Sequence, residues 1–160
     1  MQVVNAATEP KIRLNEPVRS LLRLKSTAVF SVSSDSTVFE AIEQMAEKRI
    51  GALVVLRAGS LEGIVSERDY ARKVILKGKH SQETRVRDIM TAPVLSIGPD
   101  QSIDECMRMM TAHRVRHLPV LEGELVVGMV SIGDLVNWII MSHEQTIRQL
   151  ESYITGAYPG

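Results

Sequence analysis

The chain has 160 residues, of which 19 are Lys or Arg and 19 are Asp or Glu, so its formal net charge at pH 7 is zero. This length fits one compact domain or two small halves that depend on each other. A composition of 44% hydrophobic and 24% charged residues is typical of globular proteins and argues against disordered and fibrous classes. Zero net charge argues against a strongly basic nucleic-acid-binding protein. The single cysteine, Cys106, excludes an internal disulfide and a cysteine-based zinc site.

The sequence shows no targeting or membrane-spanning pattern. Charged residues from Glu9 to Lys25 interrupt the apolar stretch that a signal peptide needs. The longest apolar run, 135–141, contains Asn137 and is far shorter than the roughly 20 residues of a spanning helix. We therefore expect a cytoplasmic protein.

Two copies of one unit make up most of the chain. An offset of 65 residues aligns 29–76 with 94–141 without a gap, and the identical pairs include Met45/Met110, Gly63/Gly128, Ser66/Ser131 and Asp69/Asp134. Upstream, residues 18–22 resemble residues 86–90 at an offset of 68. Internal repeats decide the fold class, so this symmetry governs the rest of the interpretation.

Each copy predicts the element order β-α-β-β-α. The first strands are expected at Val29–Val32 and Val94–Ile97. Thr37 with Glu40, and Ser102 with Glu105, then fit the capping box that starts a helix. Two strands follow in each copy, at 52–56 and 63–66 and at 118–121 and 126–131, and a closing helix begins after Ser66 and after Ser131.

The predicted fold is of the α/β (α+β) class, with the two repeats packed as a pseudo-symmetric pair and flanked by N- and C-terminal helical segments. We divide the chain into a mobile N-terminal arm (1–16), a first repeat (17–80), a second repeat (81–142) and a C-terminal helical extension (143–160). One unit of about 60 residues would be marginally stable alone, so the copies should share a core.

Two features lie outside the repeat pattern. An apolar seam at spacings of 4 and 3 predicts a coiled-coil-like helix, packed either within the chain or between chains; its members are Val136, Ile140, His143, Ile147, Leu150 and Ile154. A basic cluster is expected on a solvated helix face, with a weak patch for nucleic acid or an acidic partner as the alternative; its members are Lys11, Arg13, Arg19, Arg23 and Lys25.

The segments 63–69 and 128–134 contain the candidate ligand-binding residues. Each leaves a buried strand and places Ser three residues before Asp at a helix start. One interpretation is structural, because Ser-x-x-Asp is itself a helix cap. The other is functional: free amides at a helix start attract phosphate, and a carboxylate there can accept hydrogen bonds from ribose hydroxyls. The two interpretations are compatible.

The doubled unit with Gly-h-h-Ser-x-x-Asp (h, hydrophobic) after its third strand resembles a tandem pair of CBS (cystathionine β-synthase) domains, called a Bateman module. The phrases at 50–55, 63–69 and 117–120 are typical of that family, and the resemblance covers about residues 17–142. It implies that an adenosyl ligand binds in the cleft between the repeats. The implied nucleotide-binding residues are Thr27, Ile50, Gly51, Ala52, Ser66, Arg68, Asp69, Thr91, Pro93, Val115, Arg116, His117, Ser131, Gly133 and Asp134.

The two implied sites differ in charge. The second copy has Arg116 and His117 where the first has Gly51 and Ala52, whereas the first has Arg68 where the second has Gly133. Guanidinium and imidazolium groups bind phosphate well, so we expect unequal affinities.

We therefore predict a stand-alone regulatory module for signal transduction. It would bind AMP, ADP, ATP or NAD, change shape, form a homodimer and act on a partner protein. A ligand-independent interaction or dimerisation scaffold is the alternative. No catalytic motif is present, so we expect no enzyme activity. We also expect no metal site, because His113 should lie at a helix end and His117 on the next strand.

Overall fold

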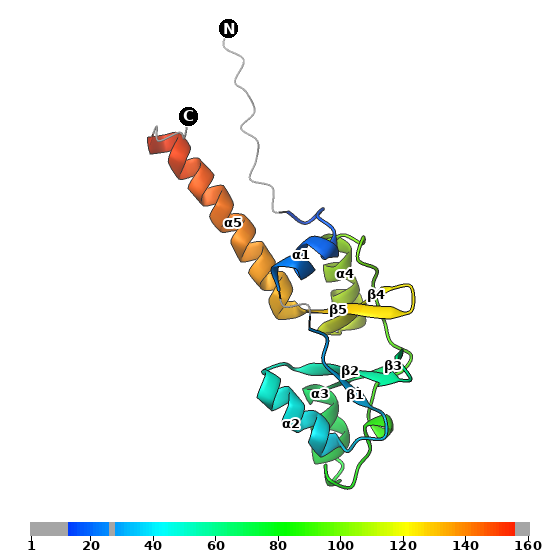
Figure 1. The fold of residues 1–160 in the computed structure, drawn as a ribbon. Helices are drawn as coiled ribbons and strands as arrows, with labels where there is room; N and C mark the ends of the chain where they lie inside the picture. Colours follow the sequence, from blue (N-terminus) through cyan, green and yellow to red (C-terminus); the bar gives the residue numbers. More distant parts are fainter. Residues whose placement is uncertain (1–12, 26–27, 156–160) are drawn as a thin grey trace.

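A computed structural model of the chain describes residues 13–25 and 28–155. It is a mixed α/β fold built from two repeats (Figure 1). The regular elements are α1 (Val18–Leu24), β1 (Ser31–Ser33), α2 (Val38–Lys48), β2 (Ala52–Arg57), β3 (Ser60–Ser66), α3 (Glu67–Tyr70), α4 (Ile103–His113), β4 (His117–Glu122), β5 (Leu125–Ser131) and α5 (Ile132–Thr155). A π-helical turn (Ala71–Ile75) continues α3, and a short 3-10 helix (Val86–Asp88) precedes the second repeat.

The two hairpins are built alike. Strands β2 and β3 pair antiparallel with Ala52 opposite Ser66, and β4 and β5 pair antiparallel with His117 opposite Ser131. Each hairpin has a register shift at the same place, in β2 after Val55 and in β4 after the matching residue of the second copy. The predicted repeat is therefore present in the backbone as well as in the sequence.

The first strands of the two copies differ. β1 runs parallel to β2 and pairs Ser31 with Val54. The predicted strand Val94–Ile97 is reduced to a single parallel bridge between Ile97 and Val120. Pro119 stands where the first copy has Val54, and it has no N–H to donate to a neighbouring strand. This residue limits the ladder, so the second sheet contains only β4 and β5.

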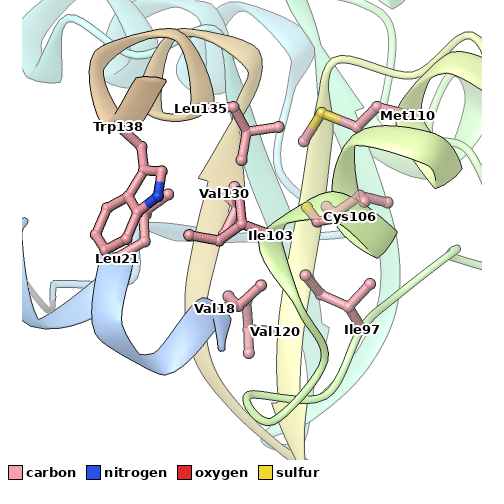
Figure 2. Packing of buried hydrophobic residues seen from close by; sticks show 11 residues of the cluster. Val18, Leu21, Ile97, Ile103, Cys106, Met110, Val120, Val130, Leu135 and Trp138 are labelled. Atoms are coloured by element: carbon pink, nitrogen blue, oxygen red, sulfur yellow. The ribbon is translucent and has the colours of Figure 1, made fainter. Parts of the chain in front are cut away.

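The segments that lead to the first strand of each repeat pack on the other repeat. Val18 and Leu21 of α1 belong to the buried cluster of the second repeat, together with residues such as Ile103 and Val130 (Figure 2). In the same way, Val86 and Ile89, which come just before the second repeat, lie in the core of the first. The chain therefore crosses from one repeat to the other once before each sheet begins.

The close approach of these crossing segments explains two glycines. A Cβ on Gly128 of β5 would lie 2.8 Å from a methyl carbon of Leu22 in α1. A Cβ on Gly63 of β3 would lie 2.6 Å from the sulfur of Met90. Both distances are shorter than van der Waals contact, so a Cβ at either glycine would force the Leu22 or Met90 side chain to shift.

Helices α2 and α4 both begin with capping hydrogen bonds. The Thr37 hydroxyl accepts from the Glu40 amide and the Glu40 carboxylate accepts from the Thr37 amide, as the predicted capping box requires. At the start of α4, the amides of Ile103 and Asp104 donate to the carbonyls of Glu16 and Leu14. These bonds satisfy amides that a helix leaves unpaired at its start.

Helix α5 is one continuous helix that extends away from the two sheets (Figure 1). Leu135 and Trp138 are buried against the second repeat, and the Trp138 indole N–H donates to the Arg13 carbonyl at 2.8 Å. Three side chains of the predicted seam are about half exposed: Val136, Ile140 and Ile147. Ile132, the first residue of α5, is exposed to a similar extent. None of the helices over residues 13–25 and 28–155 has the length and apolar character needed to cross a membrane.

Candidate functional site

The turn between β5 and α5 holds Ser131 and Asp134 in a reciprocal pair of hydrogen bonds. The Ser131 amide donates to Oδ2 of Asp134 at 2.8 Å, and the Asp134 amide donates to the Ser131 hydroxyl at 3.2 Å. The geometry is that of a capping box, and it fixes the carboxylate at the helix start. The Asp134 side chain is 22% exposed, so a ligand can reach it.

Lys25, just after α1, occupies this carboxylate. Its Nζ lies 2.7 Å from Oδ2 of Asp134 and 2.7 Å from the carbonyl oxygen of Met129 in β5. The basic cluster was expected to be solvated, and for Lys25 this prediction is wrong. The ammonium is held by the second repeat because α1 packs there.

The turn between β3 and α3 repeats the arrangement in the first copy. The amide and hydroxyl of Ser66 both donate to Oδ2 of Asp69, at 2.9 and 3.0 Å. Oδ1 of Asp69 is 3.0 Å from Nζ of Lys73, one turn later on the same helical segment. Lys73 also donates to the Ile89 carbonyl at 2.8 Å.

The segments that enter the first strands lie beside the opposite repeat's turn. Thr91 forms a two-bond bridge with Ile64 of β3, on the strand that ends at Ser66. Lys25 reaches Met129, the residue that matches Ile64 in the second copy. Both candidate sites are therefore assembled from segments that are distant in the sequence.

The two repeats contact each other at His117 and Gly51. A Cβ on Gly51 would lie 3.4 Å from two ring atoms of His117, so the imidazole rests against the glycine backbone. Arg68, at the start of α3, donates to the carbonyl of Arg114 in the second copy at 3.4 Å. Its charge therefore lies at the boundary between the repeats, close enough to His117 to act on its pKa.

The remaining predicted residues flank these turns. Ile50 and Val115 are half buried just before β2 and β4, Ala52 is buried opposite Ser66, and Arg116 is exposed. Pro93 is exposed beside Thr91, and a Cβ on Gly133 would lie 3.6 Å from the Ser131 hydroxyl. Thr27 lies outside the described residues.

Charge and burial shift two pKa values here. Burial by itself would raise the pKa of Asp134, but hydrogen bonds from Lys25 and Ser131 outweigh it and lower the pKa below its ordinary value. Burial lowers the pKa of His117, and the charges of Lys25, Arg116 and Arg68 lower it further, against the opposing effect of Asp134. At neutral pH the site therefore holds an ionised Asp134 and a neutral His117.

Metal and thiol chemistry have no support in this region. Across residues 13–25 and 28–155, no three His, Cys, Asp or Glu side chains are close enough to hold a metal ion together. His113 ends α4 and His117 begins β4, as the sequence predicts. Cys106 is fully buried in the second core, and burial raises its pKa to about 11, so it is a packing residue.

Sequence reasoning did not find the two lysines. A weak signal existed for Lys73, because a lysine four residues after Asp69 on a helix is a common ion-pair spacing. Lys25 is 109 residues from Asp134, and no local pattern links them. Only the packing of α1 on the second repeat brings this pair together.

Comparison with known proteins gives a consistent result. The family model of the CBS domain matches residues 18–76 and 86–141. The chain is 40% identical over 131 residues to the mitochondrial CBS domain-containing protein CBSX3 of Arabidopsis thaliana, and this match covers 79% of the chain but only 64% of that relative. It is 33% identical over 110 residues to the CBS domain-containing protein YhcV of Bacillus subtilis, covering 69% of the chain and 78% of that protein.

A solved structure is also similar. It is that of a CBS-domain protein from Burkholderia ambifaria, provisionally assigned to signal transduction. It superposes with a TM-score of 0.76 and 49% identity, covering 78% of this chain and 94% of the other.

Proposed function

This chain belongs to the CBS-domain family, and we propose that it is a regulatory module that binds an adenosyl ligand at Asp134 and Asp69. The ligand class is AMP, ADP, ATP or NAD. The module passes the bound state to a partner protein through a change of shape, and it is not itself an enzyme. No metal takes part in binding.

The observation that carries this proposal is the pair of matching Ser–Asp turns. At each turn a fixed carboxylate accepts hydrogen bonds and is partly open to solvent, with 22% of the Asp134 side chain and 13% of the Asp69 side chain exposed. An ammonium group contacts each carboxylate. The two vicinal hydroxyls of a ribose are neutral hydrogen-bond donors that can compete for the same carboxylate oxygens.

Positive charge near these carboxylates supports a phosphate-bearing ligand. Arg116 begins the approach to β4, and Arg68 contacts the second copy at Arg114. Guanidinium groups bind phosphate oxygens with strong, charge-assisted hydrogen bonds. Arg116 has no counterpart in the first copy, which has Gly51 there, so the two sites should bind with unequal affinity.

The crossing of segments between the repeats supplies a route for the signal. A ligand at either turn touches parts of the molecule that belong to different repeats. It therefore favours the arrangement of repeats that binds it best and shifts the population toward that arrangement.

We further propose that two copies associate through the exposed face of α5. Ile132, Val136, Ile140 and Ile147 follow one side of the helix and are each about half exposed. Leu135 and Trp138, on another side, attach the same helix to the second repeat. A second copy presents an identical apolar face with the same spacing.

A ligand-independent scaffold is the second candidate, because the same hydrogen bonds also cap α3 and α5. A thermal-shift and calorimetric series with adenosine, AMP, ADP, ATP and NAD separates the two. We expect adenine compounds to raise the melting temperature, because a ligand that binds only the folded state stabilises it.

The matched variants are Asp69→Asn and Asp134→Asn, with Asp100→Asn as the control, because the Asp100 side chain is 85% exposed and pairs with Arg19. Loss of a charged hydrogen-bond acceptor should weaken binding by roughly 10- to 100-fold. If both turn variants bind like the wild type, the site assignment is wrong. If no adenine compound binds the wild type, the scaffold is the better explanation.

A further inference from the structure

We propose that Lys25 is a built-in competitor for the ligand at the second site: its ammonium holds the Asp134 carboxylate until ribose hydroxyls displace it. This inference rests on the proposed function and adds a residue that sets the affinity of one site. It also makes α1 sensitive to occupancy of that site.

The contacts of Lys25 are specific. Its Nζ is 2.7 Å from both Oδ2 of Asp134 and the carbonyl oxygen of Met129, so one ammonium satisfies a charged and a neutral acceptor. The side chains are 34% and 22% exposed, so the pair is partly shielded from water. Charge-assisted hydrogen bonds of this kind are stronger than neutral ones.

In the first copy the ammonium on the carboxylate does not come from a distant part of the sequence. There the carbonyl of Ile64, which matches Met129, accepts from the Thr91 backbone amide at 2.8 Å, and the Ile64 amide donates to the Thr91 carbonyl at 3.1 Å. Asp69 is paired with Lys73, four residues later on its own helical segment. Lys73 also donates to the carbonyl of Ile89, whose side chain lies in the core of the first repeat.

Lys25 differs because it arrives from outside the second repeat. It lies directly after α1, whose Val18 and Leu21 are buried in the second core. When ribose takes the Asp134 carboxylate, the ammonium must leave both acceptors, and the end of α1 loses its polar attachment to β5. Binding at the second site is therefore an exchange of donors, and its apparent affinity is reduced by the free energy of the contact that is broken.

This exchange predicts how removal of the Lys25 ammonium changes the ligand affinity of the second site. Removing the ammonium leaves Asp134 free for the ligand, so the second site should bind more tightly. A phosphate would complicate this reading, because it is also attracted to the positive charge of Lys25. Adenosine has no charge at neutral pH and carries the same ribose, so it isolates competition for the carboxylate.

The experiment measures adenosine affinity by calorimetry in an Asp69→Asn background, which silences the first site. Lys25→Met removes the ammonium but keeps the aliphatic stem. Arg23→Met is the matched control, since Arg23 is an exposed cation on the same helix. We expect Lys25→Met to bind adenosine roughly 10-fold more tightly than the background, and Arg23→Met to bind as the background does.

Unchanged or weaker adenosine binding in Lys25→Met, with binding intact in the background, overturns the competitor role and leaves the proposed function standing. Adenosine binding that is lost in Asp69→Asn/Asp134→Asn but present in the wild type confirms where the ligand sits. If adenosine and AMP bind neither the wild type nor any variant, the proposed function fails and the competitor role fails with it.

A second measurement needs no substitution at Lys25. The side-chain ammonium of a lysine held in an ion pair gives a distinct NMR signal from that of a solvated lysine. We expect the Lys25 signal of the wild type to move to the solvated position as adenosine saturates the protein. A signal that stays in place at saturation contradicts displacement. Lys25→Gln then serves as a second variant if Lys25→Met folds poorly.

Discussion

Asp134 and Asp69 occupy the same position in the two copies but receive their ammonium groups from different places. Lys73 reaches Asp69 from one turn along the same helical segment, whereas Lys25 reaches Asp134 from the segment after α1. A local pair of this kind forms whenever the helix forms. The pair at Asp134 forms only when α1 is docked, so the second site reports the arrangement of the chain around it.

His117 should make stability depend on pH. Its pKa is lowered in the folded protein, first by burial and then by nearby positive charges. As pH falls from about 6.5 toward the folded pKa, the unfolded chain binds a proton that the folded protein refuses, so the free energy of unfolding decreases. Below the folded pKa both states are protonated and the loss is complete.

Urea unfolding at pH 7.5 and 5.5 measures this effect. We expect His117→Gln to lose less stability than the wild type between these two conditions. The exposed His113→Gln is the control and should behave like the wild type. An equal pH dependence in all three proteins would contradict the role of His117.

At the scale of elements, α1 is the part whose position decides most about the site. It opens the first repeat in the sequence but packs on the second, where Val18 and Leu21 are buried. Its counterpart before the second repeat, around Val86 and Ile89, packs on the first. Each repeat therefore has a core that the other repeat's leading segment completes.

Leu21→Ala tests this crossing. Leu21 is 4% exposed in the second core, and truncating such a leucine costs about 2–5 kcal/mol of unfolding free energy. We expect hydrogen exchange to speed up mainly in β4, β5 and α4. Leu24→Ala is the matched control, because that leucine on the same helix is 64% exposed and its truncation should change little. Faster exchange concentrated in β2 and β3 would show that α1 supports the first repeat instead.

For the molecule as a whole, the exposed apolar face of α5 is the surface that we expect a second copy to bury. Large apolar side chains that lie together in the open favour association. Ile140→Glu places a charge in the middle of this face, and we expect it to convert a dimer to a monomer in analytical ultracentrifugation at micromolar concentrations.

Gln145→Glu adds the same charge on the opposite side of α5 and should leave the association state unchanged. Far-UV circular dichroism checks that both variants keep their helix. A wild type that sediments as a monomer at tens of micromolar would contradict the proposed dimer, whatever the variants do.

Local patterns were sufficient for much of the fold. The capping box at Thr37, the paired hairpins and the helix after Ser131 all lie where the sequence places them, because each depends on residues within a few positions of one another. The expected first strands differ: β1 covers Ser31–Ser33 where Val29–Val32 was predicted, and Val94–Ile97 is reduced to one bridge. The single proline at 119 removes a donor from its neighbour, an effect that spacing within 94–97 does not reveal.

By itself, the sequence determined that the chain is a doubled β-α-β-β-α unit with Ser and Asp at matching helix starts. Helix caps depend on residues a few positions apart, so they can be identified from sequence spacing. Because the same spacing recurs in the second copy, each copy supports the interpretation of the other. Only the tertiary structure decided that α1 packs on the second repeat and that Lys25 holds Asp134. Contacts between residues 109 apart depend on which surfaces the chain buries together, and that choice is made by the packing of both repeats at once.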